Sequence, residues 1–99
     1  MADMRTEDYI DALKKVLEKR YSDSTYSLNG YQECAICIQS ENGHWVVYSG
    51  ERGNRYDEVI CDTVLKACLE FIRKLTHRTE DIAKMETELL DNLYASKIA

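Results

Sequence analysis

Apolar residues near the start of the chain recur at the spacing of one helical face. From Thr6 to about Arg20 polar side chains fill the opposite face, and Glu7 and Asp8 stand where negative charge favours a helix N-terminus. The apolar positions are Tyr9, Ile10, Leu13, Val16 and Leu17. This pattern predicts an amphipathic helix with Thr6 as its N-cap and its apolar face in the core.

The middle of the chain alternates apolar and polar residues between turn-forming dipeptides. Asn29-Gly30 is typical of a two-residue hairpin turn, because both central residues of such a turn need positive φ. Glu41-Asn42-Gly43 predicts a second turn. The expected strands are 26–28, 33–40, 44–48 and, as a short strand at an edge, 56–61. These segments predict an antiparallel meander of three or four strands.

Helical spacing returns in the last third of the chain. Asp62 is the expected cap of a second helix, and Thr79 begins a third that runs to near Tyr94. The apolar positions are Val64, Leu65, Cys68, Phe71, Ile72 and Leu75 in the second helix, and Ile82, Met85, Leu89 and Leu93 in the third. We therefore expect an α+β fold, in which the antiparallel meander is flanked by an N-terminal helix and two C-terminal helices. Residues 1–99 suffice for one domain.

The charge balance bears on the kind of partner. The net charge is −5, and the excess of acids lies mainly within residues 31–60, which hold five acidic and two basic side chains. Nucleic-acid binding needs clustered Lys and Arg, so we expect no nucleic-acid partner. A basic protein surface is the better electrostatic match, although solubility alone also explains an acidic surface.

The first ten residues contain no apolar run of signal-peptide length, and no window approaches the roughly 18 apolar residues of a membrane span. We expect a cytoplasmic protein with no membrane contact. In a reducing compartment the four cysteines, Cys34, Cys37, Cys61 and Cys68, are expected to be buried thiols. A zinc site is disfavoured because an offset of three along a strand sends Cys34 and Cys37 to opposite faces.

No nucleophile motif accompanies the two histidines, His44 and His77, which the pattern places at a strand boundary and at a helix end. We therefore predict no enzyme activity, no catalytic residues, no metal ligands and no cofactor. Trp45 and Tyr48 are expected to pack in the core, although aromatic residues also anchor protein interfaces.

The segment from Asn42 to Arg55, NGHWVVYSGERGNR, runs from an aromatic strand into a loop bracketed by Gly50 and Gly53. Its shape serves either to hold the domain together or to meet a partner. Together with the later helix ACLEFIRKL, this segment resembles small immunity proteins of bacterial polymorphic-toxin systems, several families of which carry a W-x-V-Y…E-R-G pattern. The matching positions are Trp45, Val47, Tyr48, Glu51, Arg52 and Gly53, and the resemblance covers about residues 31–76.

The resemblance implies a protein that binds and neutralises a cognate toxin domain by blocking its active site, a basic nuclease being one such toxin. Acidic side chains near the loop would mimic phosphates and speed association. The expected partner-binding residues are Tyr48, Glu51, Arg52, Arg55, Tyr56, Asp57, Glu58 and Asp62. The alternatives are a structural or regulatory homodimer, with the third helix as a contact, and a small enzyme.

Overall fold

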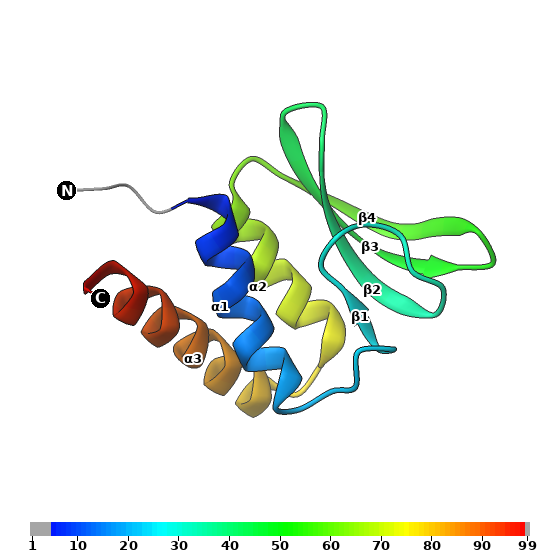
Figure 1. The fold of residues 1–99 in the computed structure, drawn as a ribbon. Coiled ribbons are helices and arrows are strands. Elements are labelled where there is room, and N and C mark those ends of the chain that lie inside the picture. Colours follow the sequence, from blue (N-terminus) through cyan, green and yellow to red (C-terminus); the bar gives the residue numbers. More distant parts are fainter. Residues whose placement is uncertain (1–4, 99) are drawn as a thin grey trace.

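The computed structural model describes residues 5–98 of the chain and the side chains of residues 5–95. Three helices lie on one face of a four-stranded sheet (Figure 1). The elements in chain order are α1 (Thr6–Glu18), β1 (Tyr26–Ser27), β2 (Ala35–Glu41), β3 (His44–Glu51), β4 (Asn54–Cys61), α2 (Val64–Leu75) and α3 (Thr79–Ile98). The predicted α+β fold with one N-terminal and two C-terminal helices is confirmed.

The first two helices begin one residue away from the predicted caps. The N-cap of α1 is Arg5 rather than Thr6, and the Asp8 carboxylate accepts a hydrogen bond from the Arg5 backbone N–H at 2.9 Å. The N-cap of α2 is Thr63, whose side chain accepts from the Lys66 N–H at 3.2 Å. Asp62, the predicted cap, instead forms an ion pair with Lys66 at 3.1 Å.

The sheet has the strand order β1-β2-β3-β4 and is mostly antiparallel. The exception is β1, which pairs parallel to β2 with Tyr26 opposite Ile36. The predicted hairpin at Asn29-Gly30 is therefore wrong. A parallel neighbour requires a connection that crosses over the sheet, and Asn29 and Gly30 lie in this connection.

Alternate residues of the central strands enter two separate clusters, because successive strand side chains point to opposite faces. On the inner face, Ile38 and Val47 join the apolar residues of the helices in the main core. The other face, which we call the outer face, carries a second cluster of buried side chains. Its members are Ala35, Cys37, Val46 and Tyr48.

The helices form two tiers above the inner face. Helix α2 contacts β2, β3 and β4, whereas α1 and α3 contact only the other helices among the described elements. The buried residues of α3 are Met85, Leu89 and Leu93. Helix α3 therefore packs on the other helices and not on the sheet.

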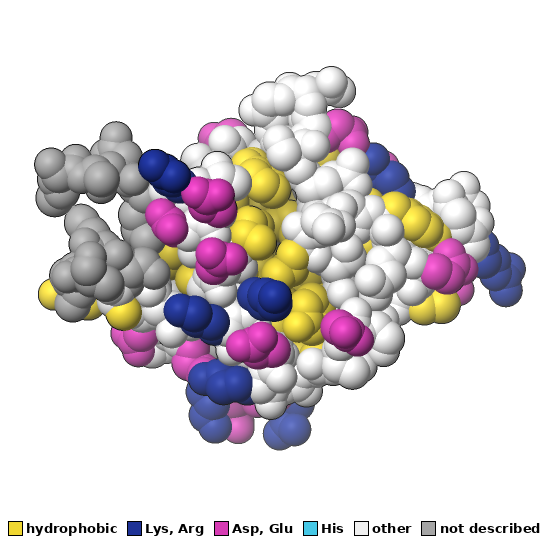
Figure 2. All heavy atoms as spheres, in the orientation of Figure 1, with side chains coloured by type: hydrophobic (Ala, Val, Ile, Leu, Met, Phe, Trp, Pro, Cys, Tyr) yellow, Lys and Arg dark blue, Asp and Glu magenta, His cyan; other side chains and the backbone are white. Residues whose placement is uncertain are grey.

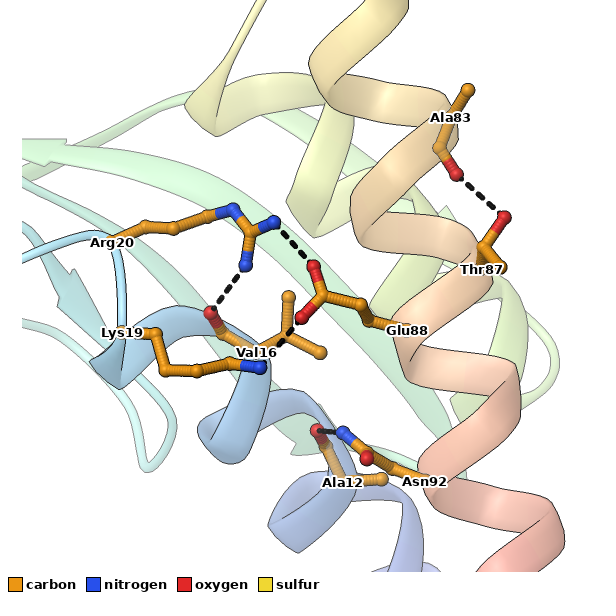
Figure 3. Close-up of polar contacts among 8 residues, drawn as sticks. All are labelled: Ala12, Val16, Lys19, Arg20, Ala83, Thr87, Glu88 and Asn92. Atoms are coloured by element: carbon orange, nitrogen blue, oxygen red, sulfur yellow. Dashed lines mark hydrogen bonds and ion pairs between the residues drawn. The ribbon is translucent and has the colours of Figure 1, made fainter.

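Polar contacts reinforce the packing of α3 on α1 (Figure 3). The Glu88 carboxylate accepts hydrogen bonds from Lys19, at 2.7 Å, and from Arg20. Arg20 first, and Lys19 second, hold the pKa of Glu88 below its ordinary range. Farther along the helix the Asn92 side-chain amide donates to the Ala12 carbonyl at 3.2 Å. These contacts fix the register between the two helices.

Candidate functional site

The E-R-G segment is the turn of the β3–β4 hairpin. Glu51 pairs with Asn54 at the ends of the strands, and Arg52 and Gly53 form the turn between them with φ of 53° and 77°. A two-residue hairpin turn needs this left-handed conformation at both central positions, which is unusual for a side chain such as that of Arg52. The turn geometry alone therefore accounts for the glycine at position 53.

The connection between β1 and β2, residues 28–34, crosses the outer face of the sheet (Figure 1). We call this segment the strap. It passes so close to Gly50 of β3 that a Cβ at this position would lie 2.5 Å from the Gln32 carbonyl oxygen. The Cys37 thiol also donates to this oxygen, at 3.6 Å. The close approach of the strap thus requires a glycine at position 50. The strap also covers the small cluster of buried side chains on the outer face.

Two side chains of the strap hold the E-R-G turn. The Glu33 carboxylate accepts from the backbone N–H groups of Arg52, at 2.7 Å, and Gly53, at 3.2 Å. Tyr31 donates its hydroxyl proton to Glu33 at 2.5 Å, and its oxygen accepts from Gly53 N–H at 2.7 Å. The hydrogen bond from Tyr31, followed by those from the two amides, lowers the pKa of Glu33. The strap and the turn are thereby joined into one unit.

A β-bulge in β4 changes which side chains share the outer face. The register shifts between Val47 and Ser49, and Asp57 in the opposing strand has φ of 53°. In a regular strand, residues three apart point to opposite faces, so Arg55 and Glu58 could not pair. The extra residue of the bulge brings Glu58 to the face of Arg55, and the two form an ion pair.

Arg55 is the centre of a polar network above the outer cluster. Its guanidinium carbon lies 4.5 Å from the centroid of the Tyr48 ring, and it also pairs with Glu41 at 2.7 Å. The Tyr48 hydroxyl donates to the Gln39 side-chain oxygen at 2.5 Å, and burial raises the pKa of Tyr48. The pairing with Arg55 lowers the pKa of Glu41. The network gives partners to the Tyr48 hydroxyl and to both terminal nitrogens of Arg55, whereas the buried Arg55 Nε has no hydrogen-bond partner among the described residues.

The predicted partner-binding residues fall into two groups. Tyr48 is fully buried, and Arg55 is engaged by Glu41 and Glu58, so both shape the surface from beneath. The remaining residues have exposed side chains on the E-R-G turn, on β4 and just after it. They are Glu51, Arg52, Tyr56, Asp57, Glu58 and Asp62.

Other residues of this region carry no signal in the sequence that predicts their role. Glu33 lies 19 residues before Arg52, and no local pattern links a carboxylate to backbone N–H groups so far along the chain. Tyr31 and Gln39 are similar cases. Ile60, with 67% of its surface accessible, is a further case, because nothing in a run of three apolar residues shows which of them faces solvent.

The cysteines are distributed over the fold. Cys34 is exposed at the end of the strap, Cys37 is in the outer cluster, and Cys61 and Cys68 are in the main core. All four are free thiols, and burial raises the pKa of Cys68 to about 12. Among residues 5–95, side chains of His, Cys, Asp and Glu form no group of three or more suited to a metal ion. A thiol with so high a pKa is a poor nucleophile at neutral pH.

None of the helices within residues 5–98 combines the length and the apolar character that crossing a bilayer requires. Comparisons of the chain with protein-family models, with curated proteins and with solved structures give no match. The fold and the surface define an α+β domain whose β3–β4 hairpin is held by the strap and carries more acidic than basic side chains.

Proposed function

We propose that this protein binds a partner protein through the β3–β4 hairpin, and that it is an immunity protein which neutralises a cognate toxin domain. The observation that carries the proposal is the construction of the hairpin. Its backbone is fixed by the strap, the bulge and the Arg55 network, while the side chains of Glu51, Tyr56 and Asp57 point into solvent. A braced surface loses little conformational entropy on binding, which favours tight association.

The charge of the hairpin supports a basic partner. Arg55 is neutralised by Glu41 and Glu58. Glu51, Arg52 and Asp57 have no ion-pair partner among residues 5–95, which leaves two unpaired acidic side chains against one basic side chain. The exposed surface therefore keeps a negative field, in line with the net charge of −5. Such a field accelerates encounter with a positively charged protein.

The proposed mechanism is occlusion of the toxin's active site. A nuclease holds its substrate phosphates with Lys and Arg, so carboxylates presented at similar positions compete for the same side chains. Tyr56, which is 46% exposed, supplies an aromatic contact beside the carboxylates. The binding protein itself performs no chemical step in this mechanism.

The test is co-expression with the product of the neighbouring gene, followed by calorimetry of the purified pair. We expect growth to be rescued and a one-to-one complex to form. The double variant Glu51→Gln/Asp57→Asn should weaken binding and flatten its dependence on salt. The matched control, Glu80→Gln/Asp91→Asn, removes the same charge from exposed positions of α3.

Failure of the wild-type protein to bind or to rescue would refute the immunity function. Equal affinity and equal salt dependence for the two double variants would refute the electrostatic mechanism while leaving the function standing. Asparagine is chosen at position 57 because it tolerates the positive φ of the bulge.

One observation favours homodimerisation as a second candidate. Leu90 and Tyr94, one helical turn apart on α3, are 51% and 67% exposed. A contact between two such helices would cover both side chains. Light scattering on the purified protein tests this, with a monomeric mass at micromolar concentration as the result that excludes it.

A further inference from the structure

The sheet ends in two unlike edges. On one side the outermost strand, β1, has only two residues, whereas on the other side β4 has eight. Within the described residues β4 pairs only with β3. Every second residue of an edge strand turns its backbone N–H and C=O away from the sheet, where they can pair with another chain. β4 therefore offers a longer row of such groups than β1 does.

The two halves of β4 differ in how well they could accept another strand. The bulge at Asp57 interrupts the first half, and bulges are one means by which proteins protect sheet edges from pairing. In the second half, Glu58–Cys61, the last three residues run in regular register with β3, with Val59 opposite Val47. Only this second half is suited to continuing the sheet.

Apolar surface flanks this second half on both faces of the sheet. On the inner side a cavity of about 510 Å³ lies between β4 and α2, and Val59, Cys61 and Leu69 contribute to its lining. On the outer face the Ile60 side chain is 67% exposed. An added strand alternates its side chains between the two faces, so both apolar surfaces would be covered at once.

The charged side chains around the cavity are balanced within the protein. Lys66 pairs with Asp62, and Arg73 pairs with Glu70 and with Glu86. The cavity consequently selects for apolar side chains rather than for charge. The preference for a basic partner comes from the neighbouring bulge, because the carboxylate of Asp57 has no ion-pair partner among residues 5–95.

Repulsion between acidic side chains disfavours a second copy of this chain at the β4 edge and favours a different partner. Antiparallel pairing of two Glu58–Cys61 segments places Glu58 opposite Cys61 of the other copy and Asp57 opposite its Asp62, so that two acidic side chains face each other at each end of the pair. Like charges across a strand pair are destabilising. An extended segment with basic side chains gains attraction at the same positions.

We infer that Glu58–Cys61 is a docking edge, which takes up an extended segment of the partner as a fifth strand of the sheet. The segment carries an apolar side chain for the cavity beside Leu69, another over Ile60, and basic side chains toward Asp57. Main-chain hydrogen bonds supply affinity, and the side chains supply selection. The inference rests on the proposed binding function and names the surface and the partner chemistry.

The experiment uses a displayed library of random 12-residue peptides, selected against the full-length protein, so that it does not depend on the toxin. We expect enriched peptides with alternating apolar and basic residues. Hydrogen exchange of the complex with the most enriched peptide should show slower exchange in 58–61 than in the free protein. Ile60→Asp should raise the dissociation constant at least about tenfold, by placing charge where an apolar contact forms.

Tyr94→Asp is the matched control, because Tyr94 on α3 has the same exposed fraction as Ile60. Unchanged affinity in this variant, with loss in Ile60→Asp, supports the inference. It is overturned if no peptide is enriched, if protection appears on α3 instead of β4, or if the free protein is a dimer that protects 58–61. Since toxin rescue is scored separately, a failed docking edge is distinguishable from a failed immunity function.

Discussion

The two faces of the sheet are made from alternate residues of the same strands, yet they are stabilised in different ways. The inner face packs against helices through a large apolar core that includes Phe71 and Ile72. The outer face has only a small buried cluster, and a seven-residue strap with a network of ion pairs and hydrogen bonds covers it. The inner face depends on buried area, and the outer face depends on fitted geometry.

Because of this difference, the residues that determine the stability of the domain are largely not those proposed to bind a partner. Removing a large core side chain costs several kcal/mol, whereas exposed ion pairs contribute at most about 1 kcal/mol each. The outer side can therefore vary in sequence without unfolding the domain, as long as the strap still fits. Figure 2 shows hydrophobic side chains between the helical layer and the sheet, with charged side chains gathered over the helices.

The largest effect is expected from breaking the inner face. Phe71→Ala removes a fully buried ring at the centre of α2 and should lower the free energy of unfolding by about 3–5 kcal/mol. Urea denaturation followed by circular dichroism measures this. Tyr94→Ala, at an exposed site, should change it by less than about 0.5 kcal/mol. A loss below about 1 kcal/mol at Phe71 would contradict the account of the inner face.

A smaller, local effect is expected when the strap is displaced. Gly50→Ala places a Cβ against the Gln32 carbonyl and should cost about 1–3 kcal/mol. Hydrogen exchange should accelerate in 28–34 more than in the helices. Ser49→Ala, at the adjacent residue, is the control. Uniform acceleration over the whole chain would show that the two faces are not separable.

The polar network over the outer cluster can be probed without disturbing its packing. Tyr48→Phe keeps the ring beneath Arg55 but removes the hydroxyl that donates to Gln39. We expect a loss of about 0.5–1.5 kcal/mol in the free energy of unfolding, the net value of one hydrogen bond. A loss above about 3 kcal/mol would mean that the ring, too, had moved. Near-ultraviolet circular dichroism checks the aromatic packing.

The smallest effect is an acid-dependent loosening of the E-R-G turn. The pKa of Glu33 is lowered from its ordinary 4.5, so its stabilising contribution is present above pH 4.5 and is lost as the pH falls through the lowered value. In an NMR titration the Arg52 and Gly53 amide signals should shift below pH 4.5. Glu33→Gln should abolish this titration. The titration of Glu88, whose pKa is lowered by Arg20 and Lys19, should remain. Identical titrations in the variant and the wild type would contradict the assignment.

Local patterns predicted the elements of this fold well. Helical spacing located all three helices, and Asn42-Gly43 forms the two-residue turn between β2 and β3, with φ of 51° and 82°. Asn29-Gly30 has the same chemistry but lies in the strap, because Gly30 donates to the Ile38 carbonyl and β1 pairs parallel to β2. An Asn-Gly dipeptide shows that a tight turn is possible. Whether it forms a hairpin turn depends on how the strands on either side of it pair.

The candidate surface was predicted only in part, since its construction depends on contacts between distant residues. The sequence placed Glu51, Asp57 and Glu58 near a shaped loop, and their side chains are exposed. It could not reveal that the strap anchors this loop through Glu33, or that a bulge turns Glu58 toward Arg55. These relations arise from the tertiary fold and leave no periodic trace in the chain.

The pairing of α1 with α3 has a consequence for the synthesis of the protein. Lys19 and its partner Glu88 are 69 residues apart, so α1 leaves the ribosome long before the helix that covers it exists. The two β-hairpins, by contrast, close over turns of two residues and can form as soon as they emerge. We expect the nascent chain to hold a formed β3–β4 arm while one side of α1 is still uncovered, and to complete its folding only after α3 has been translated.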